Sequence, residues 1–154
     1  MTHRHRAILA DLISDSTDLL LLSGYCYYNN SDDPEHQTGL KQIQQYLREE
    51  TIFQGLLLSP LTKINLHDLN PEQHEPGMFW WPVLGEITPG MPLVDHVLCA
   101  IARGECTPFF VSPQLSVLLA PYDGGMDIIL PDVSTRNFYR QKYRAWLSGR
   151  PNGL

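Results

Sequence analysis

Two carboxylates lie beside a glycine pair near the C-terminal end of the sequence. Asp123 and Asp127 bracket Gly124 and Gly125. Carboxylates placed like this could hold a divalent cation or form an acid/base pair. Asp before Gly is also ordinary turn chemistry, because the Asp side chain bonds its own backbone. We therefore predict that Asp123 and Asp127 belong to a turn rather than to a site.

A second set of possible metal ligands lies within one short stretch. Its members are His67, Asp68, Glu72, His74 and Glu75. The two histidines have six residues between them. This spacing matches no standard zinc motif, and no cysteine lies nearby. The pattern favours a solvated, turn-rich loop over a metal site.

The remaining groups that could react are three cysteines and one histidine. Cys26, Cys99 and Cys106 lie in or beside apolar segments, which is typical of buried free thiols. Three cysteines without close pairing argue against a disulfide framework and for a reducing compartment. His96 follows Asp95 on a predicted helix, where a surface position is the favoured interpretation. No nucleophile elbow, phosphate-binding loop, dinucleotide fingerprint or zinc-protease helix is present.

Phe79, Trp80 and Trp81 are the most unusual local feature of the sequence. The acidic residues around them are Asp68, Glu72, Glu75 and Glu86. Aromatic residues are enriched in interface hot spots, and an aromatic anchor ringed by carboxylates suits a basic partner. The alternative is that at least two of the three rings are core. For a functional surface, we predict Trp80, Trp81, Glu72 and Glu75 as the contacts.

Hydrophobic periodicity and breaker residues predict the elements that must position these groups. The predicted helices are residues 4–14, 39–50 and 91–103 and a last helix from Ser134 or Thr135 to Leu147. The predicted strands are 19–28, 108–112, 115–120 and 126–130, and also 51–59, which could instead continue the preceding helix. Residues 61–90 are predicted to be irregular, with 78–84 as a short strand or a core-filling segment.

This order of elements predicts an α+β fold. We expect a single mixed or antiparallel sheet of about four to five strands, with three to four helices packed on it. A C-terminal hairpin, which makes that part of the sheet antiparallel, precedes the last helix. Tyr139, Tyr143, Trp146 and Leu147 of that helix are predicted to be core. No repeat or linker divides the 154 residues, so we predict one domain, 1–154.

The composition narrows the functional classes. Hydrophobic residues make up 43% and charged residues 18% of the chain, as in a globular protein. The formal charge of −6 disfavours binding to nucleic acid and suits a basic protein partner. The apolar runs are too short to span a membrane, and no cofactor motif is present. We predict a cytoplasmic protein without a membrane segment or a cofactor.

The C-terminal hairpin resembles that of an uncharacterised bacterial family. The segment reads Tyr122-Asp-Gly-Gly-Met-Asp-Ile-Ile129 and is followed by a helix ending in Trp146-Leu147. Members of that family carry a Tyr-Asp-Asp-Arg-Gly-x-Asp hairpin and then a helix that closes with a Trp-Leu or similar pair. Here a single Gly replaces the Asp-Arg of that signature. The overall type (small, acidic, poor in motifs, α+β) is similar to the immunity proteins of bacterial toxin systems.

Three functional hypotheses follow. The first is a binding protein, concretely an immunity protein that neutralises a cognate toxin domain by direct contact. The second is a small metal-dependent hydrolase that uses His67, His74, Asp123 or Asp127. The third is a structural subunit of a larger assembly. Absent catalytic motifs, negative charge and the aromatic-acidic stretch favour the first.

Overall fold

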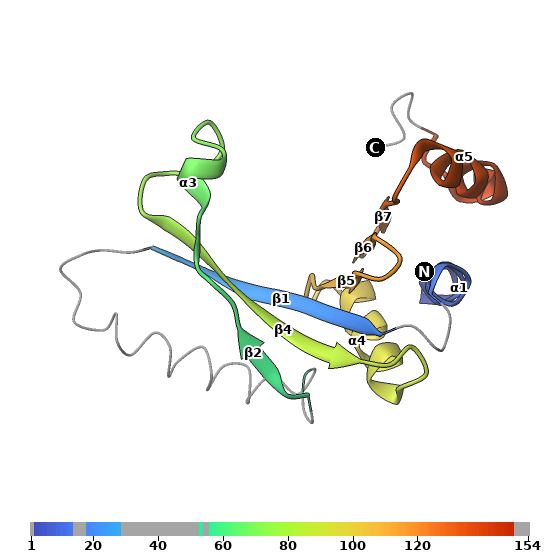
Figure 1. Ribbon diagram of the computed structural model, residues 1–154, viewed down its shortest axis with the longest axis horizontal. Helices are drawn as coiled ribbons and strands as arrows, with labels where there is room; N and C mark the ends of the chain where they lie inside the picture. The colour runs from blue at the N-terminus through green and yellow to red at the C-terminus, as the bar shows by residue number, and fades with distance from the viewer. Residues whose placement is uncertain (1, 14–17, 29–52, 54–55, 150–154) are drawn as a thin grey trace.

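A single antiparallel sheet forms the centre of the computed structural model, which describes residues 2–13, 18–28, 53 and 56–149 (Figure 1). Its strands are β1 (Leu19–Tyr28), β2 (Leu58–Pro60), β3 (Ile64–Asn65), β4 (Met78–Ile87), β5 (Phe109–Ser112), β6 (Val117–Tyr122) and β7 (Gly125–Ile129). The spatial order is β2-β4-β1-β5-β6-β7, with β3 beside β4. The predicted α+β class and single sheet are confirmed. The expected strand number is too low, because residues 61–90 contribute β3 and all of β4.

The helices are α1 (Thr2–Leu12), α3 (Leu66–Leu69), α4 (Pro92–Ala102), α5 (Val133–Lys142) and the 3-10 turn η2 (Arg144–Trp146). Side-chain caps fix two of their starts: Asn65 accepts a hydrogen bond from the backbone N–H of His67, and Asp132 accepts one from that of Thr135. The predicted helix over 39–50 lies outside the described residues. In the described part, no helix is long and apolar enough to cross a membrane.

Strands β1 and β4 form the longest ladder of the sheet. They pair over their whole lengths, from Leu19 opposite Ile87 to Tyr28 opposite Met78. Strand β5 pairs with β1 only over Leu20–Leu22. The continuous apolar and aromatic character of β1 is typical of a strand covered on both faces, but its buried residues are Leu19 and Leu21, which share one face. The second half extends past β5, and there Tyr25 and Tyr28 are 46% and 55% exposed.

The core lies against one face of this sheet. Because side chains alternate along a strand, Leu19 and Leu21 share a face with Ile87, Phe110 and Leu119, and all five are buried. Helices α1 and α4 cover that face with Ile8, Leu9, Leu12, Val94, Val97, Leu98 and Ile101. Burying each such side chain stabilises the fold by about 1.5–3 kcal/mol. The core therefore lies between this face of the sheet and helices α1 and α4.

Helix α5 packs beside this core rather than inside it. None of its residues is buried, although Tyr139, Tyr143 and Trp146 are partly buried against the core. Leu147, which we predicted to be core, is 48% exposed. The reason is topological: α5 follows the last strand of the sheet and lies beside α1 (Figure 1).

Candidate functional site

The part of β1 and β4 beyond β5 carries a cluster of aromatic rings. On one face, the ring of Tyr27 lies 5.8 Å from that of Phe79 and 6.3 Å from that of Trp81, centroid to centroid. The ammonium of Lys63 lies 4.8 Å from the Trp81 ring centroid. The indole N–H of Trp81 donates to the carbonyl of Leu61 at 3.1 Å. Trp81 is therefore only 7% exposed and supports the cluster from inside, so it is poorly placed as a direct contact.

Trp80 points to the opposite face, and its indole lies close against Gly24. A Cβ built on Gly24 would stand 2.1 Å from Nε1 of Trp80, so only glycine leaves room for the indole. Cys26 is the cross-strand partner of Trp80 and is exposed. A glycine inside a strand often marks such a close approach. Gly24 was thus the one sequence signal that could have placed Trp80 on the strand surface.

Exposed carboxylates and apolar side chains border these rings. Glu72 and Glu75 are exposed in the turns that follow α3, and the hydroxyl of Tyr28 donates to Oε2 of Glu75 at 3.4 Å. Tyr25 and Leu69 add apolar surface, Leu69 being 70% exposed. We call this region the aromatic-acidic end: it consists of Tyr25, Tyr28, Leu69, Glu72, Glu75 and Trp80. By the register of the ladder, Tyr25 lies on the face of Trp81, whereas Tyr28 and Trp80 lie on the other face. In Figure 1 the aromatic-acidic end lies around α3, at the opposite end of the molecule from α1 and α5.

Glu86 does not belong to the aromatic-acidic end, although it is close in sequence. It lies six residues beyond Trp80 on the same extended strand. At about 3.4 Å per residue, that is roughly 20 Å away. The expected ring of carboxylates therefore reduces to Asp68, Glu72 and Glu75, all of them exposed.

The structure does not bring the possible metal ligands together. Nδ1 of His67 lies 2.7 Å from the backbone carbonyl of His74, to which it donates. Asp123 lies in the β6–β7 turn as predicted, but Asp127 is a residue of β7, opposite Ala120. Four strand spacings, about 19 Å, separate β4 from β7. In the part of the chain that the structure describes, no three His, Cys, Asp or Glu side chains are grouped to hold a metal ion.

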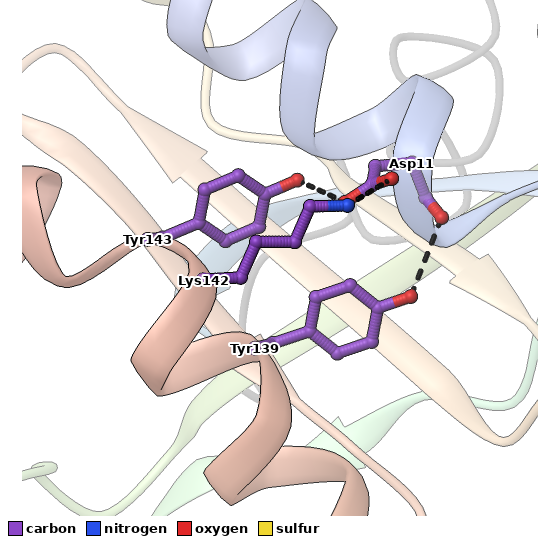
Figure 2. Close-up of polar contacts among 4 residues, drawn as sticks. All are labelled: Asp11, Tyr139, Lys142 and Tyr143. Carbon is purple, nitrogen blue, oxygen red and sulfur yellow. Dashed lines mark hydrogen bonds and ion pairs between the residues drawn. The ribbon is translucent and has the colours of Figure 1, made fainter.

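A polar cluster joins α1 to α5 at the other end of the molecule (Figure 2). The carboxylate of Asp11 accepts hydrogen bonds from Nζ of Lys142 at 2.6 Å and from the hydroxyl of Tyr143 at 2.5 Å. These bonds lower the pKa of Asp11. Partial burial raises the pKa of Tyr143, and the hydrogen bond to Asp11 raises it further. The hydroxyl of Tyr139 donates to the backbone carbonyl of Asp11 at 3.4 Å. The cluster fastens α5 to α1, and sequence patterning gave no sign of it.

His5 of α1 is a further titratable group with a structural role. It is 1% exposed, and its Nε2 donates to the carbonyl of Gly125 at 2.9 Å. Its Nδ1 is buried and has no partner among the described residues. Desolvation by burial lowers the pKa of His5, with the bond to Gly125 opposing this in part. A neutral His5 thus ties α1 to the first residue of β7.

The fold and site define a small α+β protein whose sheet is half covered by helices and ends in an exposed aromatic-acidic surface. The chain belongs to the family described as "Domain of unknown function (DUF3885)", which matches residues 1–151. No curated protein and no solved structure matches the chain.

Proposed function

We propose that this protein is a binding protein, concretely an immunity protein that neutralises a cognate toxin domain by direct contact. The observation that carries the proposal is the aromatic-acidic end. There Tyr25, Tyr28 and Leu69 are each more than two fifths exposed and lie on one end of the sheet with Glu72 and Glu75. Exposed large apolar side chains rimmed by polar ones are typical of protein interaction sites.

The charges of this region favour a basic partner. Residues 56–90 contain four carboxylates, Asp68, Glu72, Glu75 and Glu86, and a single lysine, Lys63. The ammonium of that lysine lies over the Trp81 ring. Toxin domains that act on nucleic acid need a basic surface to bind phosphates. Carboxylates at the aromatic-acidic end would accelerate association with such a surface and would occupy it.

No observation favours the metal-dependent hydrolase over this proposal. His67 is held to its own loop through Nδ1, and the sheet keeps it far from Asp123 and Asp127. A structural subunit would use the same kind of surface as an immunity protein. The two differ in whether the partner is toxic without this protein, which is what an experiment must measure.

The test starts from the product of the neighbouring gene, produced with and without this protein. We expect that product to stop growth alone and to bind this protein as a purified pair. The variant Glu72→Lys/Glu75→Lys should weaken binding by about tenfold or more, because like charges then face each other across the interface.

The matched control is Asp123→Lys/Asp127→Lys, which makes the same charge change on exposed residues of the β6–β7 hairpin. It should leave affinity and growth protection near those of the wild type. Circular dichroism of both variants checks that they fold. A neighbouring product that neither binds nor inhibits growth, or equal losses in the two variants, would overturn the proposal.

A further inference from the structure

A cavity of about 510 Å³ opens at the aromatic-acidic end. Its lining comes from β1 between Ser23 and Cys26, from residues 105–107 and Phe109, and from Trp80 of β4. It therefore begins where β1 extends past its last pair with β5, Leu22 opposite Phe109. Specific ligand pockets of proteins have volumes of this order. The cavity has room for a large side chain together with the backbone that carries it.

One wall of the cavity is apolar and has a defined shape. Trp80 is the cross-strand partner of Cys26, and Phe109 is that of Leu22. Because side chains alternate along a strand, Gly24 and Cys26 share a face with Trp80 and Phe109. The Trp80 indole lies directly against Gly24, where a Cβ would stand 2.1 Å from its Nε1. Phe53 and Leu66 also line the cavity. A surface of this kind is suited to an aromatic or large apolar side chain.

The carboxylates near the cavity that have no arginine partner lie on one side of its opening. Glu105 lines it, but Arg103 already bonds both carboxylate oxygens of Glu105, at 2.5 and 2.7 Å. His74 lines it as well, and its neighbour Glu75 is exposed, as is Glu72. The carboxylates left to meet a partner therefore lie on the α3 side of the opening.

We propose that this cavity receives one aromatic or large apolar side chain from a basic segment of the partner protein, flanked by lysine or arginine residues that meet Glu72 and Glu75. This inference rests on the proposed function and adds the chemistry of the contact. The apolar wall supplies the anchor, and the carboxylates select for basic neighbours. A buried anchor with a charged rim is the arrangement of an interface hot spot.

Three capped tripeptides test this chemistry without the natural partner. The probe is acetyl-Lys-Phe-Lys-amide. The controls are acetyl-Lys-Ala-Lys-amide, which lacks the anchor, and acetyl-Glu-Phe-Glu-amide, which reverses the charge. The protein keeps all three of its cysteines, and modification of Cys26 is measured on its own peptide by mass spectrometry, so that Cys106, which also lines the cavity, stays unchanged. Cys26 is exposed and lines the cavity, and its rate of reaction with a thiol reagent reports occupancy.

The Lys-Phe-Lys probe should slow modification of Cys26 at least threefold at millimolar concentration and shift the indole N–H resonance of Trp80. The alanine control should do neither. The charge-reversed control should need about a fivefold higher concentration or more for the same effect, because two favourable surface charge contacts become unfavourable. Equal effects of the Phe and Ala probes, or of the two charge types, would overturn the inference.

The full partner separates this inference from the proposed function. If the neighbouring gene product binds tightly but leaves Cys26 fully reactive, the cavity is not its contact and the immunity proposal stands. If the Lys-Phe-Lys probe protects Cys26 while the neighbouring product does not bind, the cavity chemistry stands and the immunity proposal fails. The variant Trp80→Ala should abolish protection by the probe, and Trp80→Phe should retain part of it. Both are checked for folding by thermal denaturation.

Discussion

Replacing Asp11 with alanine should loosen α5 from the rest of the protein. Helix α5 buries none of its residues, so its position depends on partly buried rings and on Asp11. The substitution removes the acceptor of two hydrogen bonds, one from Lys142 and one from Tyr143. It leaves the Tyr139 bond in place, because that bond goes to the Asp11 backbone.

The size of the effect follows from how exposed each bond is. The Lys142 and Asp11 side chains are 43% and 29% exposed, so solvent screens this pair and it contributes at most about 0.5 kcal/mol. The Tyr143 bond involves a partly buried hydroxyl and a charged acceptor, and we assign it about 1–1.5 kcal/mol. The expected loss in the free energy of unfolding is therefore about 1.5–2 kcal/mol at neutral pH.

Denaturant unfolding of Asp11→Ala, Tyr143→Phe and the double variant measures this. The sum of the stability losses in the two single variants should exceed the loss in the double variant by about 1 kcal/mol, because each single substitution already removes the bond between Tyr143 and Asp11. The control is Asp95→Ala, which removes another ion pair of α1, that between Arg6 and Asp95, both of which are about half exposed. That variant should change stability little.

The pH dependence supplies a second check. The pKa of Asp11 lies below its usual 3.8 in the folded protein, so its contribution is present above about pH 3.8 and is lost as the pH falls further. The pKa of Tyr143 lies above its usual 10, so its contribution is present below about pH 10 and is lost as the pH rises further. Asp11→Ala should converge with the wild type at both extremes. A difference below 0.5 kcal/mol at pH 7, or one that does not diminish between pH 4 and pH 2, would refute the reasoning about this cluster.

Two further predictions concern the sheet and α1. Gly24→Ala should destabilise the protein by about 1–3 kcal/mol and change tryptophan fluorescence, because the new methyl group meets the Trp80 indole; Gly90→Ala, where a Cβ meets nothing within 4 Å, is its control in the same thermal melts. Burial holds the pKa of His5 below 6.5, so the free energy of unfolding should decline as the pH falls below about 6.5. The variant His5→Gln should remove this pH dependence. An unchanged pH dependence contradicts the assignment of His5 as the buried neutral donor to Gly125.

Residues 78–84 were predicted as a short strand or a core-filling segment, and Pro82 explains why the sequence did not indicate the full length of β4, Met78–Ile87. A proline inside an apolar run argues against a central strand, because it has no N–H for the ladder. In the structure, the N–H of Leu61 donates to the carbonyl of Pro82 at 2.9 Å. The carbonyl of Leu61 should then accept the N–H that Pro82 lacks, and instead it accepts the indole N–H of Trp81. A side chain thus replaces a backbone donor, and hydrophobic periodicity carries no information about such a replacement.

Local pattern was sufficient where strands end at polar breakers. The bounds of β1, Leu19–Tyr28, were predicted residue for residue, and the β6–β7 hairpin within two residues at each end. The exposure of Tyr25 and Tyr28 was beyond local pattern, because it depends on the pairing of β5 with β1 only over Leu20–Leu22. The candidate site therefore depends on relative strand lengths, which no window of sequence encodes.

The net charge of the sequence also conceals an uneven distribution. Most of the lysines and arginines that the structure describes lie on α1, α5 and η2: Arg4, Arg6, Arg136, Arg140, Lys142 and Arg144. Figure 1 places those elements at one end of the molecule and α3 at the other. The α5 end also carries Asp11, Asp123, Asp127 and Asp132, so its charge is mixed, whereas carboxylates predominate around α3. A basic partner would thus be attracted more strongly to the α3 end, so the charge distribution orients the encounter as well as accelerating it. The salt dependence of association should accordingly change in the Glu72→Lys/Glu75→Lys variant, and the same charge change at Asp123 and Asp127 should leave it close to that of the wild type.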